Sequence, residues 1–408
     1  MKRKWLIAGV LLLAELALCA GIIGVFWATI GAARLGLSDI RIGDARWLGF
    51  NVNAVSVEAD ESQTFAVGGP AKLEIGSDSR GMVGEIVITG GPGDEIVVKA
   101  HKVAWGANQT EAENALTELK VKMNQNGDTV TVDVERPSTI TFGDDGLADR
   151  VDLTITVPTD TEVVARTNFG EITLSGTEGD VDVESNFGTI TITDVKAGEV
   201  TAKTNAGEVK LQNVEATGKV TLDADAGEIR FQTGSAESIT VGNNAGQVKL
   251  SELTVTEAVS VQADFGEISL EAVAAKSYDL KSNAGTITLA GASGLIKAHT
   301  DFGDVEVLDA TDAVLDLKTN SGTVRFSGTL GVGSHELKSD FGNINLILPE
   351  DVELDFDLKT DFGKISSELP IAIAGAPDEA HWVGAINGGG PDLTAKTNSG
   401  NISVEILK

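Results

Sequence analysis

The chain has 408 residues and a formal net charge of −30, with 31 Lys and Arg against 61 Asp and Glu. A surface this acidic repels nucleic acid and anionic lipid headgroups, which excludes both as expected partners. With 47 glycines and only 5% aromatic residues, the composition favours a turn-rich β protein over a helical one. The single cysteine, Cys19, rules out an intramolecular disulfide.

The N-terminus is predicted to be a membrane anchor. Residues 1–4 form a basic tip, and residues 5–33 form an apolar run longer than the ~20 residues that span a bilayer. The basic tip should stay in the cytoplasm, so the C-terminal region is expected on the extracytoplasmic side of the cell membrane, with a single pass. Residues 34–60 then form a juxtamembrane linker. A cleaved signal peptide, ending near Ala33, is the rival interpretation, but its apolar core would be unusually long.

Glu15 lies inside this apolar run and is a candidate intramembrane site, because a carboxylate in the bilayer is costly. The alternative is a protonated Glu15 that is tolerated on an isolated helix or at a helix–helix contact.

Residues 61–157 are predicted to be a β-rich N-terminal cap with early turns of the repeat described below. The stretch from Gly84 to Ile88 resembles such an early turn. One short helix is predicted near 109–119, because Asn108 can cap it with Glu111 three residues on. Its expected role is to cover the open end of the β structure, since a bare β edge invites aggregation.

Residues 158–408 contain a short phrase, Asn or Asp, any residue, Gly, any residue, Ile or Val, which recurs twelve times. Its glycines are Gly170, Gly188, Gly207, Gly227, Gly246, Gly266, Gly285, Gly303, Gly322, Gly342, Gly363 and Gly400. Successive glycines are 18–21 residues apart, except for a last gap of 37 that predicts a degenerate turn or an insertion. A fixed period near 20 predicts a solenoid with a C-terminal cap.

Each repeat alternates apolar and polar residues with the period of a β-strand. The predicted fold is therefore all-β: a single-stranded-coil parallel β-solenoid with about 18–21 residues per rung, where a rung is one turn of the coil. One inward stack is predicted to comprise Ile172, Ile190, Val209, Ile229, Val248, Ile268, Ile287, Val305, Val324, Ile344 and Ile365.

The recurrent phrase is interpreted as a structural turn ladder, in which Gly supplies the backbone angle and Asn or Asp caps the turn. Its residues include Asn168, Gly170, Asn186, Gly188, Asn205, Gly207, Asp225, Gly227, Asp264, Gly266, Asp301, Gly303, Asp340, Gly342, Asp361 and Gly363. The alternative is a row of calcium sites, which one Asp on every second rung supplies poorly, because calcium takes six to eight oxygens.

From Phe265 to Phe341, the residue between Asn or Asp and Gly alternates between large and small, as in Phe265, Ala284, Phe302 and Ser321. We expect each ring to pack over its small neighbours; the alternative is an exposed aromatic row that stacks on sugar rings. A row of lysines two residues before the corner is expected to face Glu171, Glu208, Glu228 and Glu267. Its members are Lys203, Lys281, Lys318, Lys338, Lys359 and Lys396.

No motif for catalysis, a cofactor or a metal ion is evident, so the chain is predicted not to be an enzyme. None of the four histidines has a metal-binding or catalytic spacing. The rival hypothesis is a polysaccharide lyase or hydrolase on a β-helix, for which His299, Asp301 and His335 are the best candidates.

The strings "VDLTITVP", "TNFGEITL" and "INGGGPDLTAKTNSGNISVEI" resemble the bacterial "putative adhesin" domain of unknown function over residues 65–408. The resemblance implies a membrane-anchored or surface β-strand repeat protein, with some relatives resembling envelope-stress regulators. The leading hypothesis is a membrane-anchored extracytoplasmic β-solenoid that acts as an adhesin-like binding protein. Its expected partners are the membrane, through the N-terminal helix, and envelope proteins or polysaccharide. An envelope-stress sensory or regulatory protein is the alternative.

Overall fold

The computed structural model describes residues 55–76, 83–135, 149–374 and 379–408. All of these belong to one compact unit, Asn53–Lys408. Within them, no helix is long and apolar enough to cross a membrane. The predicted anchor at 5–33, with Glu15, lies outside the described residues and stays a prediction.

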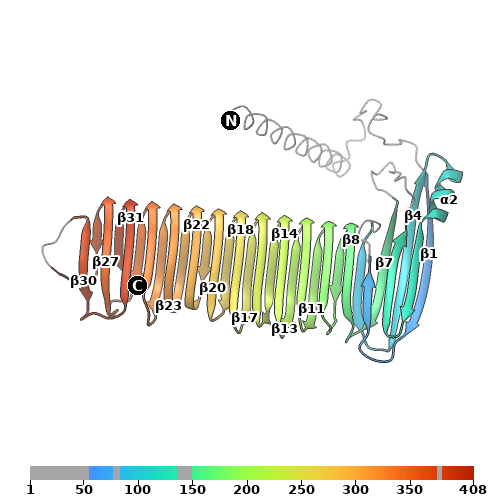
Figure 1. The fold of residues 1–408 in the computed structure, drawn as a ribbon, viewed down its shortest axis with the longest axis horizontal. Coiled ribbons are helices and arrows are strands. Elements are labelled where there is room, and N and C mark those ends of the chain that lie inside the picture. The colour runs from blue at the N-terminus through green and yellow to red at the C-terminus, as the bar shows by residue number, and fades with distance from the viewer. Residues whose placement is uncertain (1–54, 77–82, 136–148, 375–378) are drawn as a thin grey trace, which may run out of the picture. The chain divides into compact units, whose positions relative to one another are not determined.

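Two rows of parallel strands form the solenoid (Figure 1). Row A consists of β8 (Glu162–Phe169), β10 (Val181–Phe187), β12 (Val200–Ala206), β14 (Lys219–Ala226), β16 (Ser238–Ala245), β18 (Ala258–Phe265), β20 (Ser277–Ala284), β22 (Ser293–Phe302), the second part of β23 (Val305–Ser321), β25 (His335–Phe341), β27 (Leu354–Phe362) and β31 (Asp392–Ser399). Row B consists of β9 (Ile172–Ser175), β11 (Ile190–Ala197), β13 (Val209–Ala216), β15 (Ile229–Ala236), β17 (Val248–Val255), β19 (Ile268–Ala274), β21 (Ile287–Ala290), the first part of β23, β24 (Val324–Leu330), β26 (Ile344–Leu348), β28 (Ile365–Ser367) and β32 (Ile402–Ile406).

The core lies between the two rows, because each strand turns every second side chain inward. Val183 on β10, for example, is opposite Ala165 and Ala202 on the neighbouring rungs, and all three are fully buried. The predicted inward stack that begins at Ile172 is buried throughout. The prediction of an all-β solenoid is confirmed, and its apolar interior is one continuous cluster.

Row B bends where a residue adopts the left-handed backbone conformation without being glycine. The residues with φ between 52° and 56° at this bend are Asp194, Asn213, Thr233, Glu252, Ala272 and Asp309. Asn tolerates this conformation, and Asn213 Nδ2 also donates to Asp194 Oδ1 (2.6 Å) on the preceding rung. For Ala272 the conformation is strained, since its methyl group gains no hydrogen bond in return.

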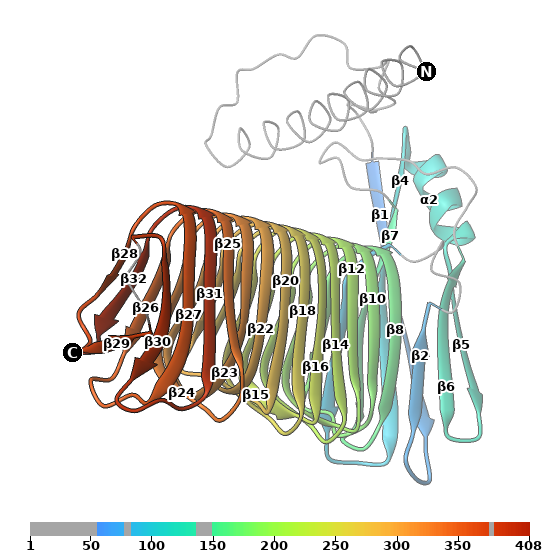
Figure 2. The same ribbon diagram turned by 60° about the vertical axis from the view of Figure 1, so that its left-hand side comes forward.

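At the C-terminal end, the rungs do not follow the order of the sequence. β31 pairs in parallel with both β25 and β27, and β32 pairs with both β26 and β28. The last rung of the chain is therefore inserted between two earlier rungs, as Figure 2 shows for β25, β31 and β27. Ile344 consequently neighbours Ile402 rather than Ile365, which corrects the predicted order of the inward stack.

The long gap before Gly400 contains an insertion, as predicted. It folds into β29 (Ile371–Ile373) and β30 (His381–Ile386), and β30 pairs antiparallel with β27 at the end of row A.

The N-terminal end has an equivalent insertion. β2 (Lys72–Ile75) lies between β6 (Thr129–Glu135) and β8, and β3 (Ile86–Gly91) lies between β7 (Arg150–Pro158) and β9. The predicted early turn near Gly84 is thus a true rung. Antiparallel strands then extend each row beyond the parallel rungs. In row A, β5 (Lys120–Asn126) pairs with β6. In row B, β4 (Glu95–Gly106) pairs with β7, and β1 (Val55–Ala66) pairs with β4.

The predicted helix is confirmed as α2 (Gln109–Glu118), which packs against β4 and β1. Asn108 caps it, because Asn108 Oδ1 accepts a hydrogen bond from the backbone N–H of Glu111 (3.1 Å). Ala112 is its buried residue.

Candidate interaction surface

The corner between row A and row B is built around a glycine that no other residue could replace without moving a rung. Gly322 has a φ of +154°, and a Cβ added to it would lie 2.0 Å from the carbonyl oxygen of Gly303 on the preceding rung. The predicted ladder residues of the sequence lie at these corners, so the recurrent glycine follows from the close stacking of one corner on the next.

The Asn and Asp residues at the corners form a line of hydrogen bonds along the solenoid. In each case Nδ2 of an Asn donates to Oδ1 of the residue on the neighbouring rung: Asn186 to Asn168 (2.9 Å), Asn205 to Asn186 (3.1 Å), Asn244 to Asp225 (2.8 Å), Asn283 to Asp264 (3.0 Å), Asn320 to Asp301 (2.8 Å) and Asn398 to Asp340 (3.3 Å). A carboxylate can only accept a hydrogen bond, so alternation with an amide gives every Asp in these pairs a donor.

A second line of hydrogen bonds, inside the corner, was missed by the sequence reasoning. The buried residue before Asn or Asp donates to the carbonyl of the glycine on the neighbouring rung, as Thr319 Oγ1 does to Gly303 O (2.8 Å). The others that do so are Ser185, Thr204, Asn243, Ser282, Thr300, Ser339, Thr360 and Thr397. The signal was present in the sequence as a recurrent Ser or Thr at a position whose strand period points inward.

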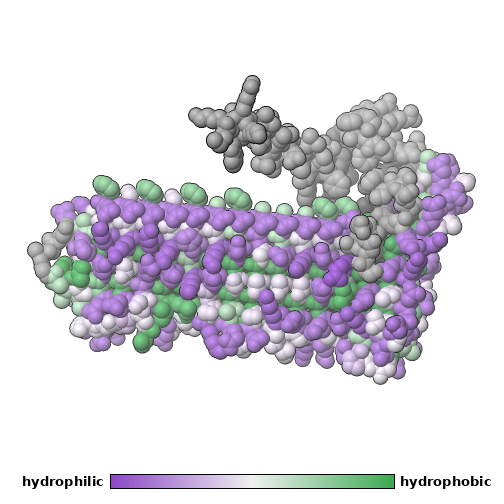
Figure 3. Space-filling model, in the orientation of Figure 1, coloured by the Kyte–Doolittle hydropathy of each residue, from purple (hydrophilic) through white to green (hydrophobic). Residues whose placement is uncertain are grey.

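The phenylalanines at the corners are exposed, and the prediction that they pack between small neighbours is wrong. The exposed fractions are 47% for Phe169, 50% for Phe187, 65% for Phe265, 66% for Phe302, 64% for Phe341 and 78% for Phe362. The side chain at this position points out of the coil, and an Ala or Ser on the next rung is too short to cover a ring. Figure 3 shows hydrophobic side chains projecting separately along the edge where row A ends.

Two of these rings are on adjacent rungs and stack on each other. The centroids of Phe169 and Phe187 are 4.8 Å apart, with an angle of 8° between the ring planes. They are also the least exposed of the six, because each ring covers one face of the other. Rings on neighbouring rungs can therefore stack wherever both rungs carry one.

The other four phenylalanines, Phe265, Phe302, Phe341 and Phe362, alternate strictly with small residues, and we refer to them as the Phe ridge. In sequence order the alternation fails between Phe341 and Phe362. In space, β31 places Ser399 between those two rings. The inserted rung thus restores the alternation of Phe with small residues, and that of Asp with Asn, up to the last rung of row A.

The predicted lysine row is real, but its expected partners are wrong. Lysines of row A pair with carboxylates of the same row: Lys281 with Asp279 (3.0 Å), Lys318 with Asp316 (2.9 Å) and Glu336 (2.8 Å), Lys338 with Asp340 (3.2 Å), Lys359 with Asp361 (3.6 Å) and Lys396 with Asp357 (3.0 Å). The expected glutamates lie across the corner on row B, where Glu208 pairs with Lys210 and Glu228 with Arg230 (2.7 Å). The hydrogen bonds that Lys318 donates to Glu336 and Asp316 raise the pKa of Lys318.

The three residues of the enzyme hypothesis do not form one site. His299 Nε2 lies 3.4 Å from Asp301 Oδ1 on the exposed side of row A. His335 points inward and is only 2% exposed, its Nδ1 accepts a hydrogen bond from Leu315 N (3.3 Å), and burial lowers its pKa. In the described part of the chain, no group of three or more His, Cys, Asp or Glu residues is arranged to hold a metal ion.

A recess of about 840 Å³ lies where β29 and β30 fold beside β27 and β31. Its polar side chains include Asp357, which contacts His381 Nε2 (2.8 Å) and Lys396 Nζ (3.0 Å). Burial raises the pKa of Asp357, but the hydrogen bonds from Lys396 and His381 outweigh burial, so the pKa lies below its usual value. The contacts hold the inserted strands together.

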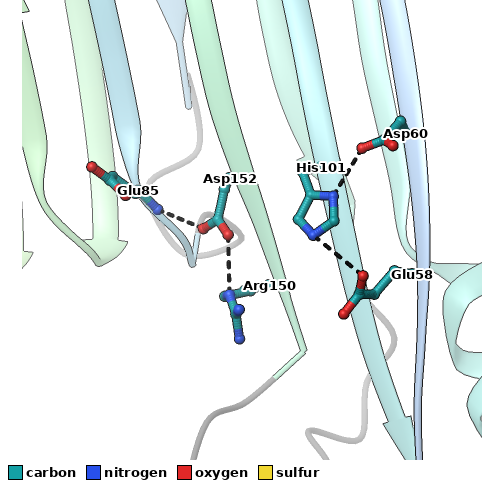
Figure 4. A network of polar contacts seen from close by, with 6 residues as sticks. All are labelled: Glu58, Asp60, Glu85, His101, Arg150 and Asp152. Carbon is teal, nitrogen blue, oxygen red and sulfur yellow. Dashed lines mark hydrogen bonds and ion pairs between the residues drawn. The ribbon is translucent and has the colours of Figure 1, made fainter.

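A polar network at the N-terminal cap has a similar structural role (Figure 4). His101 Nδ1 on β4 lies 2.8 Å from Asp60 Oδ1 on β1, directly across the strand pair. Asp152 on β7 accepts hydrogen bonds from the backbone N–H of Glu85 (3.0 Å) and from Arg150 Nε (3.1 Å). The first contact joins the antiparallel strands β1 and β4, and the second joins β7 to the start of the rung of β3.

Fold and surface together define the class: a β-solenoid protein whose stacked polar corners carry an exposed apolar ridge. The chain belongs to the Toastrack DUF4097 family, whose profile matches residues 83–291 and 239–405. The resemblance to a domain of unknown function drawn from the sequence is thereby confirmed. No curated protein matches the chain.

Two solved structures are similar to parts of the chain. The crystal structure of a "putative adhesin" from Bacteroides fragilis has 13% sequence identity and a TM-score of 0.37, and the match covers 61% of this chain and 96% of the other. That of a "putative cell adhesion protein" from Clostridium sporogenes has 12% identity and a TM-score of 0.18, with 86% and 100% covered.

Proposed function

We propose that the protein is a membrane-anchored, extracytoplasmic binding scaffold of the adhesin type, which acts without catalysis. The anchor is the apolar segment 5–33, preceded by the basic tip. The solenoid carries the contact surface along the edge that bears the Phe ridge. Its partner is an envelope protein or a polysaccharide, not nucleic acid.

The Phe ridge is the observation that supports this proposal. Its four phenylalanines are between 64% and 78% exposed and lie in one line, whereas the same corner position holds Ala or Ser on the intervening rungs. The fold therefore does not need a ring at this position. A line of exposed rings on an otherwise acidic surface is the kind of apolar feature that marks an interaction site.

The residues beside the ridge narrow the choice of partner. Each ring follows directly after an aspartate of the corner line, for instance Asp301 before Phe302 and Asp340 before Phe341. A partner that places carboxylates opposite these aspartates would bring like charges together, so a partner with neutral or basic groups at these positions is favoured.

Capture of envelope material by the full chain tests the proposal. The double variant Phe302→Ala/Phe341→Ala should retain at least tenfold less envelope protein or polysaccharide than the unmodified chain. The matched control is Val332→Ala, because Val332 is 96% exposed but lies away from the ridge, in the turn before β25. Equal capture by all three chains would contradict the proposed surface.

The proposed location has its own test. Protease added to intact cells should digest the region after residue 34, and a chain that resists until the cells are lysed would rule out the extracytoplasmic location.

A further inference from the structure

The Phe ridge has the periodicity of a surface that can pair with itself. From Ala245 to Phe362, row A presents corner residues in the spatial order Ala245, Phe265, Ala284, Phe302, Ser321, Phe341, Ser399, Phe362. Rungs are about 4.8 Å apart, so neighbouring rings of the ridge are about 10 Å apart with a gap between them. Four rings and four gaps alternate along eight rungs.

Each gap has the size of one additional ring. The Phe169–Phe187 pair shows that rings on adjacent rungs of this solenoid stack with centroids 4.8 Å apart. A ring from another molecule, placed in the gap at Ser321, would lie at this same spacing from Phe302 on one side and Phe341 on the other. A second copy of the same ridge offers rings with the required spacing of two rungs.

In an antiparallel arrangement of two copies, each of the four rings of one copy faces a gap of the other along all eight rungs. The two-fold axis then lies between the rungs of Phe302 and Ser321, so that Phe302 enters the partner's gap at Ser321 and the reverse. By the same symmetry, Phe341 of one copy lies against Ala284 of the other, Phe265 against Ser399, and Phe362 against Ala245. Such an isologous interface closes after two copies.

The polar line beside the ridge is compatible with this register. Asp and Asn alternate in phase with Phe and the small residues, as in Asp301–Phe302 and Asn320–Ser321. Under the antiparallel two-fold axis, the line of Asp and Asn lies on the same side of both ridges. Because each Phe faces a small residue of the partner, each Asp also lies opposite an Asn. A carboxylate therefore faces an amide donor rather than a second carboxylate.

We propose that the Phe ridge pairs antiparallel with the ridge of a second copy of this chain, its rings filling the partner's gaps. The inference rests on the proposed function and names the partner of that same surface. The exposed area of the four rings is roughly 500 Å² per copy, about 1,000 Å² for the pair, which is typical of a weak, reversible interface.

Sedimentation of the full chain in neutral detergent micelles tests the pairing. We expect a reversible dimer that Phe302→Ala/Phe341→Ala weakens at least tenfold. We also expect dimerisation to strengthen with salt, because a net charge of −30 on each copy opposes it. A monomer at every concentration and salt, or a double variant that dimerises like the unmodified chain, would overturn the proposal.

The variant Ser321→Phe separates interdigitation from general stickiness. It fills the central gap with a ring, as at Phe169 and Phe187, and leaves the surface more apolar. Interdigitation predicts that Ser321→Phe loses the dimer, whereas unchanged or stronger dimerisation would refute it. Circular dichroism of each variant checks that the solenoid is intact.

Cross-linking between two cysteine variants tests the antiparallel register. In a Cys19→Ser background, Asp361→Cys on one chain and Asn244→Cys on the other should be joined by a short bifunctional thiol reagent. Each variant alone should not cross-link, since its two copies would lie about seven rungs, or roughly 34 Å, apart. Efficient cross-linking of either variant alone would contradict the register. If the chain stays monomeric but capture of envelope material still depends on the ridge, the pairing fails while the proposed function stands.

Discussion

Substitution of Gly322 by alanine should destabilise the solenoid locally, by an amount that the corner geometry sets. The new Cβ would lie 2.0 Å from Gly303 O, about 1.4 Å inside ordinary contact, so the two rungs must separate. Separation breaks two hydrogen bonds at this corner, from Gly303 N to Ser321 O (3.0 Å) and from Thr319 Oγ1 to Gly303 O (2.8 Å). Each lost hydrogen bond should lower the free energy of unfolding by about 1 kcal/mol, and the positive φ of an alanine by about 1 kcal/mol more. The expected loss in the free energy of unfolding is therefore about 3 kcal/mol.

Gly93→Ala is the matched control, because Gly93 has a comparable φ of +140° but nothing within 4 Å of the added Cβ. Gly93→Ala should lower the free energy of unfolding only through the strain of an alanine at positive φ, by about 1 kcal/mol. Urea unfolding of the full chain, followed by circular dichroism, gives the two values, and amide hydrogen exchange should show faster exchange at Gly303 only in Gly322→Ala. Equal destabilisation by both variants would mean that φ alone explains the recurrent glycine, and that the contact between stacked corners contributes nothing.

Three further predictions concern single residues of the scaffold. Thr319→Val removes the hydroxyl that bonds Gly303 O and should cost about 1 kcal/mol in the same urea assay; an unchanged midpoint would show that the inner line of hydrogen bonds is dispensable. Ala272→Gly removes the strain of a φ of 52° and loses only an exposed methyl group. It should therefore raise the free energy of unfolding by about 0.5–1 kcal/mol, and a lower free energy of unfolding would contradict the strain at Ala272. Burial lowers the pKa of His335 below its ordinary 6.5, so the unfolded chain binds more protons and stability should fall as pH drops through about 6.5. His335→Gln keeps an acceptor for Leu315 N but cannot titrate, and it should lose less stability between pH 7.5 and 5.5 than the unmodified chain; identical pH profiles would refute this.

The two ends of the solenoid show where local sequence stops determining the structure. The spacing of glycines predicts rungs, but it does not say which rung stacks on which. At the C-terminal end, the rung of β31 and β32 enters between two rungs that precede it in the sequence. At the other end, the rung of β2 and β3 enters between two rungs that follow it in the sequence. The sequence indicates this insertion at Asp340 and Asp361, where Asp follows Asp instead of alternating with Asn. Two carboxylates on adjacent rungs would give each other no amide donor.

The Phe ridge shows a different limit. An alternation of large and small residues is compatible with inward packing and with outward projection, because both obey the same period. What decides between them at Phe302 is the direction of the Cβ at the corner, which depends on how the glycine after it bends the chain. The interpretation of these rings as packed residues was therefore wrong, although the residues themselves had been identified.

The sequence by itself determined the repeat, the strand period, the buried stack from Ile172 onward, the corner glycines and the helix capped by Asn108. These depend on short-range chemistry: alternation along a strand, the backbone freedom of glycine, and the capping of orphan N–H groups. Only the tertiary structure decided the order of the terminal rungs and the exposure of the Phe ridge. Both depend on which rungs become neighbours, and a residue such as Ser399 meets Phe341 and Phe362 only after the chain has folded back between them.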